Sequence, residues 1–105
     1  MKIFGIKNCD KIRATIKWCQ SSERECQLHD YRVDGIDRQL LDSFLSQYSI
    51  DELINKRSTT WRNLTEQEKS KLTTDIIINN PTLLKRPIVD IDGMYHIGYF
   101  PEKWH

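Results

Sequence analysis

Residues 2–19, KIFGIKNCDKIRATIKWC, contain the pattern that decides the fold. The stretch opens with a short apolar segment, residues 2–6, that predicts a strand. From Asp10 onward the apolar residues recur with the period of one helix face. They are Ile12, Ile16 and Cys19. Cys9 is therefore expected where a strand gives way to a helix, and a helix N-terminus stabilises a thiolate and attracts anions.

The composition is that of a soluble globular chain without a strong bias. The 105 residues are 30% charged with a net charge of +1, so nothing predicts general attraction to nucleic acid or to an anionic membrane. No apolar run approaches the length of a membrane span, and no signal peptide is recognisable. The three cysteines are odd in number and widely spaced, so they do not predict a disulfide framework. We expect one domain, residues 1–105, of a reduced, cytoplasmic and monomeric protein.

The middle of the chain predicts a second strand followed by helices. Residues 26–31 alternate in polarity, and a compact strand–helix–strand unit requires this strand to run parallel to the first. Asp37 is a good N-cap for a helix, and Thr65 opens a capping box. Further helices are expected from Asp51 and over 73–80, whereas 56–62 has no clean period and is expected to be a loop. A helical insertion is thus predicted over about residues 37–80.

The C-terminal part returns to strands. Residues 87–91 and 94–98 flank Asp92-Gly93, a strong hairpin signal, and a short helix is expected over 101–104. This order of elements is that of an α/β, thioredoxin-like fold with a helical insertion between the β-α-β unit and the C-terminal hairpin. Proteins of that fold carry a cis-proline opposite the active cysteine, so we expect Pro87 to follow a cis bond.

Three basic clusters are brought toward one end of the sheet in such a fold. They are Lys7, Lys11 and Arg13; Lys56, Arg57 and Arg62; and Lys85 and Arg86. Together they predict an anion pocket around a single thiol, because the planar guanidinium of arginine binds oxyanions and carboxylates in pairs of hydrogen bonds. The first cluster is expected to be a solvated face that raises the local potential.

Four segments resemble the arsenate reductase (ArsC) superfamily, and most of all its YffB branch. They are GIKNCDKI at 5–12, HDYRVDG at 29–35, KRSTTWR at 56–62 and KRPIV at 85–89. By this resemblance, which covers the whole chain, Cys9 is the nucleophile, Arg57 and Arg86 bind the oxyanion, and Pro87 is the cis-proline. Asn8, Asp10, Lys11 and Pro87 are then expected to contact the substrate.

Two departures from the relatives narrow what the resemblance implies. Glutaredoxin-linked arsenate reductases bring a third arginine from just after the last strand, where this chain has residues 98–101, Gly-Tyr-Phe-Pro. Spx-type regulators carry a second cysteine three residues after the first, where this chain has Ile12. The resemblance therefore favours neither arsenate as the substrate nor the redox switch of Spx.

A single thiol needs an external thiol to complete a redox cycle. Cys19 lies ten residues along the same predicted helix, roughly 15 Å from Cys9, whereas a disulfide needs Cα atoms within about 7 Å. Cys26 is expected at the opposite end of the sheet, and both cysteines are expected to be structural. Glutathione, with two carboxylates for the arginines, is the leading external thiol, and the sequence predicts a glutathione-dependent thiol reductase.

Other functions remain open at this stage. They are a non-catalytic, Spx-like partner-binding module and arsenate reductase proper. No bound cofactor is expected, and the spacing of Cys9, Cys19, Cys26 and His29 fits no usual metal site. His29 and His96 need only a satisfied hydrogen bond, and Asp10 is explained by the preference of a first helical turn for a carboxylate.

Overall fold

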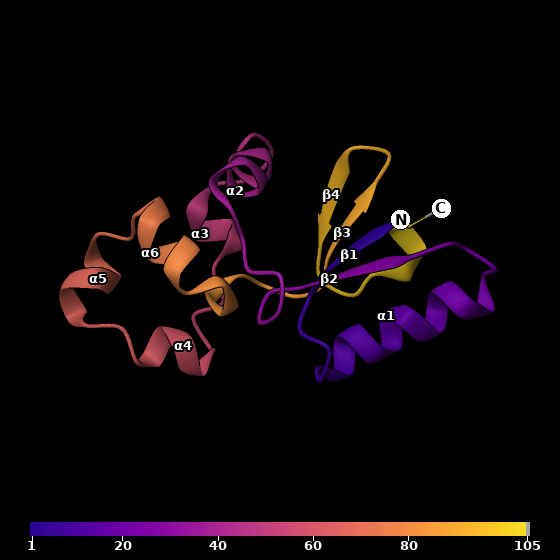
Figure 1. The fold of residues 1–105 in the computed structure, drawn as a ribbon, viewed down its shortest axis with the longest axis horizontal. Coiled ribbons are helices and arrows are strands. Elements are labelled where there is room, and N and C mark those ends of the chain that lie inside the picture. Colours follow the sequence, from indigo (N-terminus) through magenta and orange to yellow (C-terminus); the bar gives the residue numbers. More distant parts are fainter. Residues whose placement is uncertain (105) are drawn as a thin grey trace.

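A four-stranded sheet in the order β2-β1-β3-β4 forms the centre of the computed structural model, which describes residues 1–104 (Figure 1). β1 (Lys2–Gly5) runs parallel to β2 (Gln27–Asp30) on one side. On the other side β1 pairs antiparallel with β3 (Ile88–Ile91), which pairs antiparallel with β4 (Met94–Ile97). The α/β fold class, the parallel pair and the C-terminal hairpin are thereby confirmed.

Helix α1 (Asp10–Ser21) covers one face of this sheet. Side chains of successive strand residues point to opposite faces, so Ile3 and Phe4 in β1 belong to different parts of the core. Ile3 packs with Ile12 and Cys19 of α1, and all three are buried. The helical period in the sequence therefore identified the packed face of α1 correctly.

Helix α2 (Arg38–Leu45) packs on the opposite face. The ring of Phe44 meets that of Phe4 edge-on at 5.1 Å and that of Tyr95 at 4.8 Å, distances typical of favourable aromatic pairs. Asp37 caps the helix as predicted, since its carboxylate accepts a hydrogen bond from the backbone N–H of Leu40 at 2.8 Å.

The rest of the insertion is a group of short helices set away from α1 (Figure 1). Two of them, α3 and α5, begin with complete capping boxes. Their bounds are α3 Ile50–Leu53, α4 Thr59–Arg62, α5 Glu66–Ser70 and α6 Thr74–Asn79, followed by 3₁₀ turns at Pro81–Leu83 and Pro101–Lys103. None of the helices within residues 1–104 is long and apolar enough to cross a membrane.

Helix α4 corrects the expectation that residues 56–62 are a loop. The hydroxyl of Ser58 accepts a hydrogen bond from the backbone N–H of Trp61 at 3.1 Å, which starts a single helical turn. A helix of four residues is too short to show a helical period. Its N-cap serine was the available signal.

An isolated bridge between Ile54 and Leu84 joins the end of α3 to the segment before β3. Asn55 donates its backbone N–H to the carbonyl of Leu83, and Lys85 donates to that of Leu53, both at 2.8 Å. The two basic segments that the sequence places about thirty residues apart therefore lie side by side.

The cysteines correct the expectation of a fully reduced chain. Cys19 and Cys26 form a disulfide, with their Cα atoms 6.3 Å apart. Cys19 lies near the C-terminal end of α1, and the chain turns there and leads back to the sheet at Cys26, just before β2. This return places the two residues within bonding range. Cys9 is the free cysteine.

Candidate functional site

Cys9 is the N-cap residue of α1 and has extended backbone angles, φ −112° and ψ 133°. Its carbonyl accepts the first helical hydrogen bond, from the N–H of Arg13 at 2.9 Å, while its thiol makes no capping bond. The side chain is half-buried. The free thiol thus lies at the positive end of a helix of 12 residues, where a negative charge is stabilised.

Gly5 fixes how closely this helix approaches the sheet. A Cβ atom at position 5 would lie 2.7 Å from Cγ1 of Ile12, which is fully buried and has no room to move away. The same Cβ would lie 3.4 Å from Cβ of Arg86. The glycine therefore lets α1 pack against the end of β1 at the point where the Arg86 segment also arrives.

The Arg86–Pro87 peptide bond is cis, which confirms the expectation for Pro87. Pro87 is buried, and its carbonyl accepts a hydrogen bond from the backbone N–H of Gly98 at 2.8 Å. Arg86 is half-buried, and its guanidinium donates to the carbonyl of Thr82 at 3.4 Å. Arg86 thus lies just before the buried start of β3, with its guanidinium against the Thr82 carbonyl.

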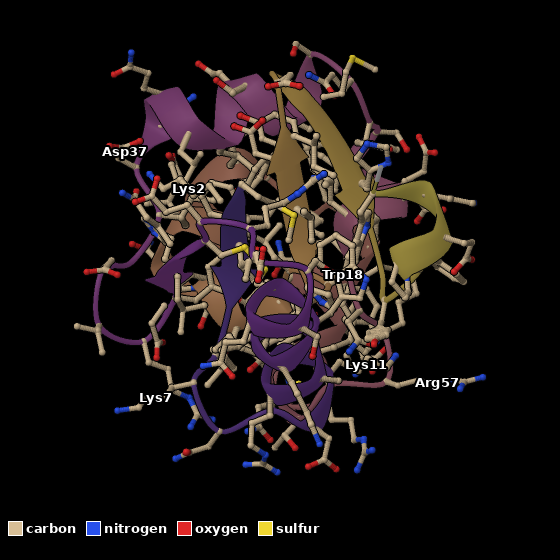
Figure 2. All side chains as sticks on the ribbon, turned by 90° about the vertical axis from the view of Figure 1, so that its right-hand side faces the viewer. Lys2, Lys7, Lys11, Trp18, Asp37 and Arg57 are labelled. Carbon is tan, nitrogen blue, oxygen red and sulfur yellow. A yellow bond between two sulfur atoms is a disulfide. The ribbon has the colours of Figure 1, made fainter. Side chains whose placement is uncertain are left out.

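Arg57 is positioned by a local turn rather than by packing. Its backbone N–H donates to the side-chain oxygen of Asn55 at 3.0 Å, and its carbonyl accepts from the guanidinium of Arg62 at 3.2 Å. Figure 2 shows the Arg57 side chain extending outward from the protein near Lys11, with Lys7 on the opposite side of α1. Arg57 can therefore reach a ligand that arrives from solvent.

A cavity of about 450 Å³ brings the basic clusters together. We call it the cationic cavity. It is lined by Lys11, Asp51, Ile54, Asn55, Lys56, Arg57, Lys85, Arg86, Ile97 and Gly98. Of the expected site residues, Lys11, Arg57 and Arg86 line it, whereas Asn8, Cys9, Asp10 and Pro87 do not. Cys9 is the N-cap residue two positions before Lys11, and its side chain packs against the cluster of Ile3, Ile12 and Cys19.

The charges around this cavity favour an anionic ligand. Asp51 is the acidic lining residue, and its carboxylate is paired with Lys56 at 3.1 Å. Asp10, which stays a predicted substrate contact, forms an ion pair with Arg13 on the exposed side of α1. The positive charges of Lys11, Arg57 and Arg86 have no carboxylate partner among residues 1–104 and remain available to a ligand.

The side chain of Tyr31 interacts with the positive charge of Arg86 from within the core. Tyr31 is fully buried at the end of β2, and its hydroxyl has no hydrogen-bond partner. Burial raises the pKa of Tyr31 far above its usual value, while the positive charge of Arg86 acts in the opposite direction. Arg86 therefore lies at the boundary between the apolar core and the cationic cavity.

Two contributors to the site were missed by the sequence analysis. Asn55 shapes the Arg57 turn, and Gly98 lines the cavity with a positive φ of 97°. Asparagine before a basic pair and glycine after a strand are both turn signals, which could have indicated them. No group of three or more His, Cys, Asp or Glu side chains within residues 1–104 is arranged to hold a metal ion.

Known proteins match this chain over almost its whole length. A solved structure described as a YffB protein superposes with a TM-score of 0.86 at 28% identity, covering 96% of this chain and 92% of its own. An uncharacterized protein of Haemophilus influenzae is 50% identical over 101 residues, which are 92% of this chain and 89% of that protein. The global transcriptional regulator Spx of Staphylococcus epidermidis is 30% identical over 105 residues, covering 92% and 78%. Residues 4–105 match the ArsC family, and the chain belongs to it.

Proposed function

We propose that this chain is a glutathione-dependent thiol reductase in which Cys9 is the nucleophile. The observation that carries the proposal is the free thiol of Cys9 at the N-terminus of α1, the helix whose Lys11 lines one cavity together with Arg57 and Arg86. Membership of the ArsC family supports reductase chemistry in general. The identity of the co-substrate rests on the chemistry of the site.

The cationic cavity suits the carboxylates of glutathione. Arg86 is held at the cavity wall, whereas Arg57 extends from a turn and can close over the ligand. Each guanidinium can donate two parallel hydrogen bonds to one carboxylate. Lys11 adds a third positive charge from the helix that carries Cys9.

The reaction proceeds by two thiol–disulfide exchanges. The Cys9 thiolate attacks the glutathionyl sulfur of a mixed disulfide, a new disulfide to glutathione forms, and the substrate leaves as a thiolate that takes up a proton. The thiolate of a second glutathione then attacks the glutathionyl sulfur, which releases glutathione disulfide and restores the Cys9 thiolate. The net reaction consumes one free glutathione per turnover, because the other half of the glutathione disulfide is the glutathionyl group removed from the substrate.

The second thiol comes from outside the chain in this cycle. Cys19 and Cys26 are bonded to each other, so neither offers a thiol to resolve the Cys9 intermediate. We further propose that the protein acts as a cytoplasmic monomer without a bound cofactor, and that it binds neither nucleic acid nor membranes.

Steady-state kinetics with the mixed disulfide of glutathione and 2-mercaptoethanol test this function. We expect Cys9→Ser to abolish turnover, and Arg57→Ala and Arg86→Ala to raise KM. Lys7→Ala is the matched control, because Lys7 also carries a positive charge near Cys9 but points away from Arg57 (Figure 2). Undiminished turnover by Cys9→Ser would refute the proposal.

A partner-binding role is the second candidate, favoured by the 30% identity to Spx. A reductase needs Cys9, whereas an adaptor does not. Co-purification with RNA polymerase that is unaffected by Cys9→Ser, together with no turnover of the mixed disulfide, would favour the adaptor. Arsenate is a further substrate to assay, although the position of a third oxyanion-binding arginine is occupied here by residues 98–101.

A further inference from the structure

A second hollow of about 280 Å³ adjoins the cationic cavity and shares Lys85 and Ile97 with it. We call it the lateral hollow. Its remaining lining residues are Tyr48, Glu52, His96, Phe100 and Lys103. Lys85 and Ile97 line both spaces, so the lateral hollow lies directly next to the cationic cavity. The proposed reaction with a small mixed disulfide uses none of the residues that belong to the lateral hollow alone.

The absence of a side chain at Gly98 leaves room for the Phe100 ring at the edge of this hollow. A Cβ atom at position 98 would lie 2.7 Å from the Phe100 ring, so the glycine lets the ring fold back over the end of β4. The ring is nevertheless 47% exposed. A large aromatic side chain held half in solvent beside a cavity offers apolar contact area at a low cost in conformational entropy.

One ammonium group lies over this ring. The ammonium of Lys103 lies 5.0 Å from the ring centroid, and neither Lys103 nor Lys85 forms an ion pair with a carboxylate among residues 1–104. Glu52 is the acidic member of the hollow. Its carboxylate accepts the backbone N–H of Ser49 at 3.0 Å in the cap of α3, and it also interacts with the positive charge of Lys85. The hollow therefore combines an apolar surface with the ammonium group of Lys103, which has no carboxylate partner among residues 1–104.

We propose that the lateral hollow binds an acidic polypeptide segment next to a glutathionylated cysteine. The inference rests on the proposed function and narrows its substrate class to protein mixed disulfides. The glutathionyl group occupies the cationic cavity, while the segment lies over Phe100 with a carboxylate at Lys103. A small leaving thiol has no group that reaches the hollow, whereas a polypeptide does. The positive charge of the hollow favours a segment that carries carboxylates.

The chemistry is that of the proposed cycle with a polypeptide as the leaving group. The Cys9 thiolate attacks the glutathionyl sulfur, the disulfide to the polypeptide breaks, and the cysteine of the polypeptide leaves as a thiolate and is protonated. One free glutathione then attacks the glutathionyl sulfur on Cys9 and leaves as glutathione disulfide, whose other half is the glutathionyl group taken from the polypeptide.

The test compares three mixed disulfides of glutathione: a peptide with glutamates flanking its cysteine, the same peptide with lysines instead, and 2-mercaptoethanol. We expect Lys103→Glu to lower the ratio of kcat/KM for the acidic peptide to that for 2-mercaptoethanol by about fivefold, because an attraction becomes a repulsion. The ratio for the lysine peptide should rise. Lys17→Glu, the same charge change at an exposed position on α1, should alter neither ratio.

Opposite shifts in the two kcat/KM ratios would support docking in the lateral hollow. Turnover of the lysine peptide by Lys103→Glu also shows that this variant is folded and active. Ratios that Lys103→Glu leaves unchanged, or that Lys17→Glu changes equally, would overturn the inference. If the wild-type protein does not turn over the 2-mercaptoethanol substrate, the proposed function itself fails. These two failures are therefore distinguishable.

Discussion

Reduction of the Cys19–Cys26 disulfide should lower stability by an amount that follows from its position in the chain. The bond joins residues with a sequence separation of 7 and thereby restricts the unfolded chain. Loss of chain entropy in a loop of this size corresponds to about 2.4 kcal/mol at 25 °C. The entropy of unfolding of a domain of this length converts that free energy to a shift in Tm of roughly 11 °C.

Urea unfolding and differential scanning calorimetry, each with and without a phosphine reductant, measure this effect. Wild-type and Cys9→Ser proteins should both lose about 2.4 kcal/mol on reduction. Cys19→Ala/Cys26→Ala should show no effect of the reductant, and peptide mapping without reductant should recover the linked pair from the wild type. An unchanged Tm of wild-type protein after complete reduction, verified by mass, would refute the entropy argument. An equal shift in the double variant would show that the effect has another origin.

Three further predictions concern single side chains. Gly5→Ala should destabilise the fold by about 1–3 kcal/mol in urea unfolding, because the added methyl group overlaps the buried side chain of Ile12; wild-type stability would contradict the packing described here. Tyr31→Phe should be at least as stable as wild type, because it removes a buried hydroxyl without a partner. Above pH 10 this variant should also lose less stability than the wild type. In the wild type, Tyr31 ionises first in the unfolded state, because burial raises its pKa in the folded state. A clear loss of stability of Tyr31→Phe at pH 7 would show that the hydroxyl has a role in the fold. Hydrogen bonds from Ser49 lower the pKa of Glu52 below its usual 4.5. The ionised carboxylate therefore stabilises the fold fully above pH 4.5, and this stabilisation is lost as the pH falls through the lowered pKa of the folded state. Thermal unfolding of Glu52→Gln should therefore vary less with acid pH than that of the wild type, and identical profiles would count against the capping box.

The fold could be predicted where local signals and tertiary packing agree. The apolar period of α1, the Asp37 cap and the Asp92-Gly93 turn each identify an element that the structure contains. Helix α4 was not predicted because a single helical turn contains no repeat of the apolar period. Elements shorter than two turns are set by capping and by their neighbours, and only the cap is visible in the sequence.

The cysteine pairing needed information that the sequence does not contain. The number of cysteines and their spacing favoured free thiols. Cys19 was compared with Cys9, as a possible resolving thiol, and was not compared with Cys26. The pairing of Cys19 with Cys26 depends on where the chain leaves α1 and re-enters the sheet. A turn between a helix and a strand fixes that geometry, and turn positions are among the least predictable features.

The candidate site was predicted in its parts rather than in its arrangement. Arg57 and Arg86 line one cavity, as expected, but they meet through the bridge between Ile54 and Leu84. An isolated pair of residues leaves no alternation in the sequence. The pairing of Asp10 with Arg13 could have been predicted, because a carboxylate and a guanidinium three residues apart share one helix face.

Trapping of Cys9 with glutathione tests the central claim most directly. Cys19→Ala/Cys26→Ala protein, incubated with glutathione disulfide and analysed by intact mass and peptide mapping, should gain one glutathionyl group on Cys9. Added glutathione should remove that group, and Arg57→Ala/Arg86→Ala should slow its formation. A Cys9 that stays unmodified, or is modified no faster than a free cysteine and regardless of the arginines, would contradict the account.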